Sequence, residues 1–171
     1  MHRLLALAVA VTLAAPLAAD AKMLAPGDAF PAWSLTDHTG APLASKDLAG
    51  KRYLLWYYPK AETPGCTTEG LSLKEHYEEL RAKGVEVIGV SFDAPAANAK
   101  FVKAQGFPFR LLSDTDRALA TQVGAAESKE QTVAKRISYL VGTDGKVEKA
   151  YPNVVPDQHV REVLADLASV K

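Results

Sequence analysis

Apolar and aromatic runs recur along the chain at intervals that predict β-strands. The two clearest, residues 53–58 and 85–92, are nearly continuous apolar runs, as in central strands that are buried on both faces of a sheet. A weaker run covers residues 109–112. Further on, residues 137–141 and 147–151 flank an Asp-Gly pair, which is typical of the turn of a β-hairpin.

Helical spacing of apolar residues fills the intervals between these runs. In the first expected helix Leu73, Tyr77 and Leu80 follow one another at i, i+4 and i+7, and Gly84 provides a C-terminal stop. The later helices are marked by two sets of residues: Ala97, Phe101 and Ala104 before Gly106, and Val160, Val163, Leu164, Leu167 and Val170.

The order of these elements indicates the fold class. Strands and helices alternate in the first part of the chain, which indicates parallel strands, whereas the later hairpin adds antiparallel ones. We therefore predict an α/β fold with a thioredoxin-like topology, in which helices flank a central mixed β-sheet. Residues 22–51 contain several prolines and glycines and are expected to form an N-terminal β-hairpin with loops. Residues 22–171 are expected to make one domain, because no linker interrupts them.

The first 21 residues have the pattern of a secretory signal peptide. Arg3 precedes an almost wholly apolar segment, residues 4–17, and Ala19-Asp20-Ala21 is the small-x-small pattern that signal peptidase cleaves. We predict cleavage after Ala21 and a periplasmic or secreted mature protein. The alternative is an uncleaved membrane anchor, but an apolar core of about 14 residues is short for a span, and Pro16 disfavours an unbroken helix.

Composition and charge narrow the possible functions. The 20 Lys and Arg residues balance the 20 Asp and Glu residues, so bulk attraction to nucleic acid or anionic lipid is not expected. After the N-terminal segment no charge-free run of about 18 residues occurs, which excludes a bundle of membrane-spanning helices. The single cysteine excludes an internal disulfide and any CxxC redox or zinc motif.

That cysteine, Cys66, lies where the first helix is expected to begin. Thr63 is a favourable N-cap and Pro64 a favourable first residue, so Cys66 occupies the third helical position. Free backbone N–H groups and the helix dipole favour a thiolate there, and the pKa of the thiol is expected to fall from about 8.5 towards a reactive range. The alternative is a small buried cysteine beside an ordinary helix start. A single thiol kept in an oxidising compartment favours the reactive cysteine.

The residues around Cys66 resemble those of a known family. Pro59-x-x-x-Thr63-x-x-Cys66 matches the Pro-x-x-x-Thr/Ser-x-x-Cys signature of peroxiredoxins, which are thiol-dependent peroxidases. The strings Tyr-Pro-Lys and Thr-Pro-Gly-Cys-Thr-Thr-Glu resemble the bacterioferritin-comigratory, or peroxiredoxin Q, branch of these AhpC/TSA-like proteins. Further matching segments follow in the same order over nearly the whole chain after residue 21, from Pro26-Gly27-Asp28 to Asp144-Gly145-Lys146.

The resemblance implies a role for each of five residues. Cys66 corresponds to the peroxidatic cysteine, whose thiolate attacks the O–O bond and becomes a sulfenic acid. Arg136 is similar to the arginine that sits beside the thiolate and donates to the peroxide, and Glu69 to the acidic residue that orients this arginine. Thr63 resembles the hydroxyl that hydrogen-bonds the peroxide, and Pro59 the residue that shields the sulfur from water. Taken singly, Arg136, Glu69 and Thr63 could instead be a solvated charge, a helix-surface group and a simple cap.

The chain departs from this branch at the resolving cysteine. Many relatives carry one five residues after the peroxidatic cysteine, where this chain has Leu71, or on the next helix, where residues 95–106 contain none. The resemblance therefore implies a one-cysteine cycle without a cofactor, in which an external thiol reduces the protein after a hydroperoxide has oxidised it. A thioredoxin- or glutaredoxin-like protein or a small thiol could serve. The segment of residues 125–135 looks shorter than in relatives. Because this loop is expected near the site and near dimer surfaces, the resemblance leaves both a monomer and a homodimer open.

Other interpretations stay open beside the peroxidase. His38, His76 and His159 have no metal-ligand spacing, so no metal site is expected. No protease signature surrounds the cysteine to support a Cys–His hydrolase dyad. A disulfide reductase would lack the second cysteine that releases a mixed disulfide. The alternative function is a non-catalytic redox sensor or a thioredoxin-like binding module.

Overall fold

A computed structural model describes residues 22–169, so the expected signal peptide and Val170 lie outside the described residues. The strands are β1 (Ser34–Asp37), β2 (Pro42–Ala44), β3 (Arg52–Tyr57), β4 (Val85–Ser91), β5 (Arg110–Ser113), β6 (Ile137–Val141) and β7 (Val147–Tyr151). The helices are the short 3-10 helix η1 (Ser45–Leu48) and α1 (Pro64–Glu75), α2 (Tyr77–Ala82), α3 (Pro95–Gln105), α4 (Ala118–Val123) and α5 (His159–Ser169).

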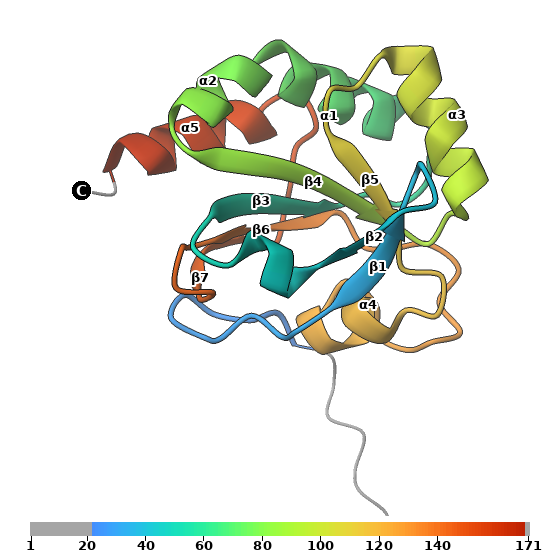
Figure 1. Cartoon of the computed structure of the whole chain (residues 1–171), viewed down its shortest axis with the longest axis horizontal. Coiled ribbons are helices and arrows are strands. Elements are labelled where there is room, and N and C mark those ends of the chain that lie inside the picture. The colour runs from blue at the N-terminus through green and yellow to red at the C-terminus, as the bar shows by residue number, and fades with distance from the viewer. Residues whose placement is uncertain (1–21, 170–171) are drawn as a thin grey trace, which may run out of the picture.

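These strands form one mixed sheet of seven strands, in the order β2-β1-β5-β4-β3-β6-β7 (Figure 1). β3, β4 and β5 run parallel because helices lead the chain back to the starting edge between them. The other neighbouring strands pair antiparallel, including the N-terminal hairpin of β1 and β2. The predicted α/β fold with a mixed sheet and an N-terminal hairpin is thus confirmed.

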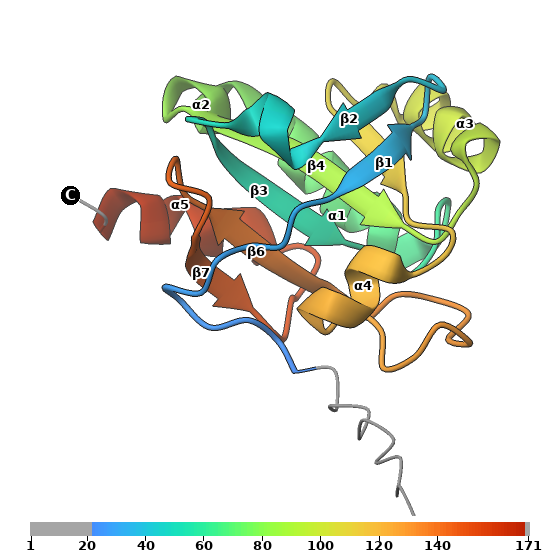
Figure 2. The same cartoon turned by 60° about the horizontal axis from the view of Figure 1, so that its bottom comes forward.

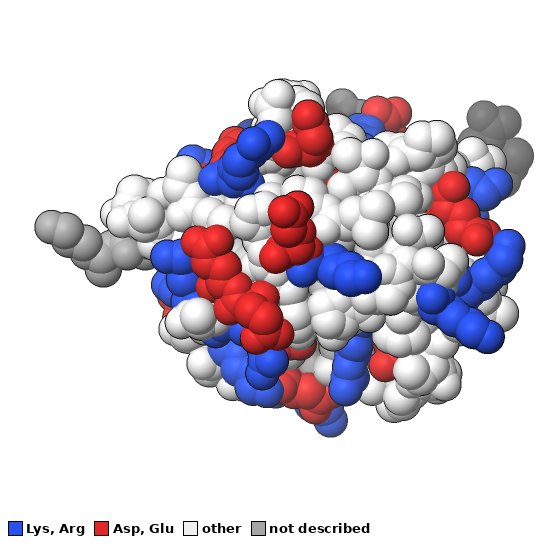
Figure 3. All heavy atoms as spheres, turned by 90° about the horizontal axis from the view of Figure 1, so that it is seen from above, with Lys and Arg blue, Asp and Glu red and all other residues white. Residues whose placement is uncertain are grey.

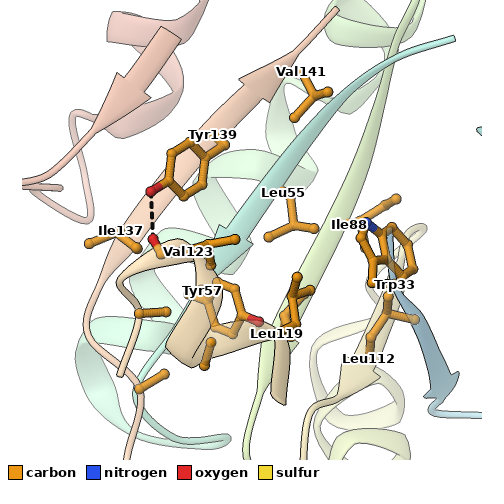
Figure 4. Packing of buried hydrophobic residues seen from close by; sticks show 14 of the residues in the cluster. Trp33, Leu55, Tyr57, Ile88, Leu112, Leu119, Val123, Ile137, Tyr139 and Val141 are labelled. Atoms are coloured by element: carbon orange, nitrogen blue, oxygen red, sulfur yellow. Dashed lines mark hydrogen bonds between the residues drawn. The ribbon is translucent and has the colours of Figure 1, made fainter. Parts of the chain in front are cut away.

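The interior strand β3 is buried on both faces because its alternate residues enter two different cores. Leu54 and Trp56, with Tyr58 just beyond the strand, pack into the core beneath α1, α2, α3 and α5. Leu55 and Tyr57 face the opposite core, which α4 covers (Figure 4). The uninterrupted apolar run that predicted this strand is the direct result of this two-sided burial.

The chain before β1 runs along β7 and past α4 (Figure 2). The N–H of Gly27 donates to the carbonyl of Val147 at 2.8 Å, and the N–H of Leu24 donates to the hydroxyl of Tyr139 at 3.0 Å. These contacts make the chain from its first described residues part of the folded body.

The first expected helix is two helices in the structure. α1 and α2 are separated by His76, whose φ of −101° and ψ of 13° depart from helical geometry. Leu73, Tyr77 and Leu80 still face the same core. The break therefore leaves the predicted buried face intact.

The predicted apolar stripe of α3 is wrong at Ala104, which is exposed. The helix buries Asn98 and Phe101 instead. Asn98 accepts a hydrogen bond from the hydroxyl of Tyr58 at 2.6 Å and donates to the hydroxyl of Ser113 at 3.1 Å. These bonds satisfy its amide inside the protein, which is why a polar residue occupies a position that an apolar pattern does not detect.

Candidate active site

The candidate site lies where the chain passes from β3 into α1. Thr63 is the N-cap residue, Pro64 begins the helix, and Cys66 is the third helical residue, as predicted. The hydroxyl of Thr63 donates to the carbonyl of Lys60 at 2.8 Å rather than to the first turn of α1. Thr63 therefore tightens the preceding loop, and the first N–H groups of the helix remain available to other acceptors.

Asp93, just after β4, holds the loop that precedes α1. Its Oδ2 accepts hydrogen bonds from the N–H of Ala61 at 2.8 Å and from the hydroxyl of Ser91 at 2.9 Å. Glu62 has a φ of 62°, in the left-handed region of backbone conformations. Its side chain forms an ion pair with Lys100 of α3 at 2.9 Å. The start of α1 is thus anchored to the end of the neighbouring strand and to α3.

Arg136 reaches the cysteine from the strand beside β3. Ile137, at the start of β6, pairs with Tyr57 at the end of β3, and this register brings Arg136 next to the start of α1. Nη2 of Arg136 donates to Sγ of Cys66 at 3.4 Å, and Nη1 donates to Oε2 of Glu69. One guanidinium therefore bridges the sulfur and the carboxylate.

The side chains of this group are largely shielded from solvent. The side chain of Glu69 is fully buried, as is Cys66, whereas that of Arg136 is 19% exposed. Burial alone would lower the pKa of Arg136, but the adjacent Glu69 and Cys66 outweigh it and raise the pKa above its usual value. Arg136 is therefore a permanent cation. Its Nη2 therefore places a positive charge 3.4 Å from Sγ of Cys66.

Pro59 and Thr63 lie in the adjoining loop. Pro59 lines a surface depression of about 330 Å³; its other lining residues are Lys60, Phe92, Asp93, Thr132 and Val133. Within residues 22–169, Arg136 is the hydrogen-bond partner found for Cys66 Sγ, and Thr63 is not. The structure thus brings Cys66, Arg136 and Glu69 into contact, whereas Pro59 and Thr63 lie in the loop before α1, with the hydroxyl of Thr63 bonded to Lys60.

Two further residues of this site were not identified from the sequence. A Cβ on Gly65 would lie 3.1 Å from Nη2 of Arg136, so the guanidinium packs directly on the glycine. His159, the first residue of α5, places Nδ1 3.0 Å from Oε1 of Glu69. Gly65 could have been identified from its place in the Thr-Pro-Gly-Cys string. No local sequence pattern marks His159, because its partner Glu69 is distant in the sequence.

Among residues 22–169, no group of three or more His, Cys, Asp or Glu side chains is placed to hold a metal ion. Of the helices described, none is both long and apolar enough to cross a membrane.

Comparison with known proteins places the chain among thiol peroxidases. The model of the AhpC/TSA family matches residues 26–150. Peroxiredoxin Bcp of Escherichia coli K12 is 36% identical over 143 residues, which cover 81% of this chain and 92% of that protein. The chloroplastic peroxiredoxin Q of Sedum lineare is 32% identical over 146 residues, covering 85% of this chain and 78% of that protein.

Solved structures give the same relationship. Peroxidoxin BcpB of Mycobacterium tuberculosis superimposes with a TM-score of 0.79 at 29% identity, covering 85% of this chain and 97% of that one. Peroxiredoxin Q of Xanthomonas campestris gives a TM-score of 0.76 at 31% identity, covering 89% and 99%. The chain therefore belongs to the AhpC/TSA family and is a thioredoxin-fold peroxiredoxin of the Bcp/peroxiredoxin Q type, an enzyme that reduces peroxides with a thiol.

Proposed function

We propose that this peroxiredoxin is an exported one-cysteine enzyme in which Cys66 attacks the peroxide. The observation that carries the proposal is the 3.4 Å contact between Sγ of Cys66 and Nη2 of Arg136. The same guanidinium is held by the buried Glu69. A thiolate is the nucleophile that peroxide cleavage requires, and Arg136 supplies the positive charge that favours it.

In the first step the Cys66 thiolate attacks one oxygen of hydrogen peroxide or an organic hydroperoxide. The S–O bond forms as the O–O bond breaks, so the sulfur is oxidised to a sulfenic acid. The departing oxygen takes a proton and leaves as water or an alcohol. Arg136 donates to the oxygen on which negative charge develops, and the N–H of Cys66 is the second proposed donor. Thr63 joins them when its hydroxyl turns from the carbonyl of Lys60 to the peroxide.

Access to the sulfur requires a movement of the residues that cover it, because Cys66 is fully buried. Pro59 lies at the start of the stretch that leads into α1. We assign Pro59 the role of keeping bulk water from the sulfur, which protects the thiolate and the sulfenic acid between encounters.

The second half of the cycle uses an external thiol, because Cys66 is the single cysteine of the chain. That thiol attacks the sulfenic sulfur, water leaves, and a mixed disulfide forms. A second external thiol then attacks the mixed disulfide, which releases the Cys66 thiolate and an oxidised reductant. The reductant is a thioredoxin- or glutaredoxin-like protein or a small thiol.

One experiment tests the reaction. Reduced protein receives one equivalent of hydrogen peroxide, and its intact mass is measured with and without a sulfenic-acid trap. We expect rapid addition of one oxygen at Cys66, capture by the trap, and continued peroxide consumption once dithiothreitol is present. Fast oxidation without turnover would indicate the redox sensor instead, and oxidation as slow as that of free cysteine would leave only a binding module.

Two variants locate the chemistry. Cys66→Ser is expected to abolish peroxide consumption, because a hydroxyl is a far poorer nucleophile than a thiolate. Arg136→Ala is expected to lower the rate by at least about tenfold in a protein that remains folded, since one charge-stabilising donor is lost. Unchanged kinetics in Arg136→Ala would remove this residue from the site.

The proposal of export rests on residues 1–21, with their apolar segment and the Ala19-Asp20-Ala21 cleavage pattern. We expect the protein from the periplasm or medium of a Gram-negative host to begin at Lys22. Intact-mass measurement of the exported protein checks this, and a mature N-terminus at Met1 would contradict it.

A further inference from the structure

His159 is a buried histidine whose ring nitrogens have no hydrogen-bond partner among the described residues, and its ring lies next to the carboxylate of Glu69. Its side chain is fully buried at the start of α5, and its ring packs edge-on against Tyr151, with centroids 5.6 Å apart. Nδ1 lies 3.0 Å from Oε1 of Glu69, with the two groups turned out of hydrogen-bond alignment. Within residues 22–169, neither of these atoms nor Nε2 has another hydrogen-bond partner.

The short distance implies that a proton lies between the two groups. A carboxylate lone pair and an imidazole lone pair 3.0 Å apart inside a protein would repel each other, and unsatisfied buried polar atoms are costly. A slight turn of the ring directs an Nδ1–H at Oε1. Each carboxylate oxygen of Glu69 then accepts from its own partner: Oε2 accepts from Arg136, and Oε1 accepts from His159.

We propose that His159 is a positioning residue for the peroxidase reaction: by holding Oε1 of Glu69, it keeps the guanidinium of Arg136 against Sγ of Cys66. The inference rests on the proposed function of Cys66. It connects four side chains from three separate parts of the fold: Cys66 and Glu69 lie in α1, Arg136 directly precedes β6, and His159 begins α5.

The geometry explains why Glu69 needs a second partner. Without His159, the fully buried Oε1 would have no partner, and the carboxylate would either turn both oxygens to Arg136 or take up a proton. In the first case the guanidinium is drawn toward Glu69 and away from the sulfur. In the second case the guanidinium loses the negative charge of Glu69 that holds it in place. Both outcomes weaken the 3.4 Å contact between Arg136 and Cys66.

A purely structural role, in which His159 only ties α5 to α1, predicts something different. Loss of such a tie would lower the stability of the protein without changing the reactivity of the sulfur. Val163, fully buried one turn further along α5 in the same core, offers a matched control for that effect. The ring of His159 contacts two titratable groups from other elements, Glu69 of α1 and Tyr151 of β7, and Glu69 links it to Arg136.

The test compares His159→Asn, His159→Leu and Val163→Ala in the full mature protein. The side-chain nitrogen of asparagine can occupy the position of Nδ1, whereas leucine fills the space without a donor. Three quantities are measured: the pH midpoint of Cys66 alkylation by iodoacetamide, the second-order rate constant with hydrogen peroxide, and the thermal unfolding midpoint. The alkylation measurement reports the thiolate without any peroxide.

For His159→Leu we expect the alkylation midpoint to move to higher pH and the peroxide rate constant to fall by at least about tenfold, because the donor is displaced. His159→Asn should recover most of both. Val163→Ala should lower the unfolding temperature alone. The inference is overturned if His159→Leu keeps the wild-type midpoint and rate, or if His159→Asn is as impaired as His159→Leu.

The design allows for a variant that does not fold, and it separates failure of the inference from failure of the proposed function. If His159→Leu does not fold, His159→Gln, which cannot readily place its amide nitrogen at the Nδ1 position, is compared with His159→Asn in its place. If the wild-type protein does not react rapidly with peroxide, while the alkylation midpoint still depends on His159, the proposed function fails, whereas the holding of Arg136 against Cys66 through His159 and Glu69 is still supported.

Discussion

At the scale of single residues, the site depends on the shape of one guanidinium. Arg136 uses one nitrogen for Glu69 and the other for Cys66, which a planar fork of donors permits. A lysine would offer a single ammonium and could not keep both contacts in this geometry. The third contact of Arg136 is with a backbone, because Gly65 leaves no side chain between the guanidinium and α1.

This packing predicts the effect of Gly65→Ala. The added Cβ would lie 3.1 Å from Nη2 of Arg136, so the guanidinium must move by a few tenths of an ångström. We expect the rate constant with hydrogen peroxide to fall severalfold, whereas the free energy of unfolding stays within about 1 kcal/mol of the wild type, since alanine favours the helix. Stopped-flow kinetics and urea unfolding measure the two quantities.

Thr68→Ala serves as the control, because Thr68 is exposed on the same helix. Its rate constant should match that of the wild type. A Gly65→Ala protein that reacts at full speed would show that the guanidinium tolerates the extra methyl group, and the tight packing at Gly65 would then have no part in catalysis.

At the scale of elements, α1 shows why an apolar pattern alone does not reveal the site. Its buried residues are Cys66, Glu69, Gly70 and Leu73, which follow the i, i+3, i+4, i+7 spacing of one helix face. This face includes a charged residue and a glycine, so its hydrophobic signal is weak. Leu71 lies off this face, five residues after Cys66, and is 41% exposed.

The geometry of α1 predicts the behaviour of Leu71→Cys. Residues five apart in an α-helix have Cα atoms about 8.6 Å apart, beyond the limit of about 7 Å for a disulfide. A bond between positions 66 and 71 therefore forms only after the first turns of α1 unwind. We expect peroxide to produce a sulfenic acid first and an intramolecular disulfide afterwards, with loss of helical circular dichroism.

Intact mass after quenching follows the two steps, and Glu75→Cys, further along α1, is the control that should keep a trappable sulfenic acid. Leu71→Cys protein whose sulfenic acid is as long-lived as that of the wild type would contradict this prediction. It would mean that α1 does not unwind at its start.

At the scale of the whole molecule, the site is assembled by the sheet. β6 lies next to β3 although long stretches of chain separate them, and this pairing delivers Arg136 to Cys66. On the helical face seen in Figure 3, acidic and basic side chains are intermixed. Global stability depends on the same sheet, and the hairpin of β1 and β2 forms its edge opposite β7.

The end of that hairpin strand links stability to pH. The carboxylate of Asp37 accepts hydrogen bonds from the N–H and hydroxyl of Thr39, at 2.8 and 2.6 Å, and from the N–H of Ala41 at 3.1 Å. Burial alone would raise the pKa of Asp37, but these hydrogen bonds outweigh it and lower the pKa. Ionised Asp37 therefore contributes stability above its unfolded pKa of about 3.9, and this contribution is lost as pH falls through the lower folded value.

We expect Asp37→Asn to lower the free energy of unfolding by about 1–2 kcal/mol at pH 7. Below a pH of about 4 the difference from the wild type should shrink, because the wild-type carboxylate is itself being protonated. Urea unfolding at a series of pH values measures this, with Asp157→Asn at an exposed position as the control. A difference that stays constant from pH 7 to pH 3 would contradict the assignment.

Much of the architecture could be predicted from the sequence because its signals are local. The run at residues 53–58 marks a strand buried on both faces, and Thr63 and Pro64 mark the start of the helix that carries Cys66. The break at His76 and the buried Asn98 could not be predicted in this way. Both depend on the contacts that the helices make with the rest of the protein, which override local preference.

The sequence by itself determined the α/β class, the position of the single cysteine at a helix start, and the absence of a second cysteine. Through the resemblance to peroxiredoxins it also indicated Arg136 and Glu69. Only the tertiary structure decided that Arg136 packs on Gly65 and that His159 stands behind Glu69. The physical reason is that these contacts join residues far apart in the chain, and strand pairing and helix packing, rather than any local pattern, bring them together.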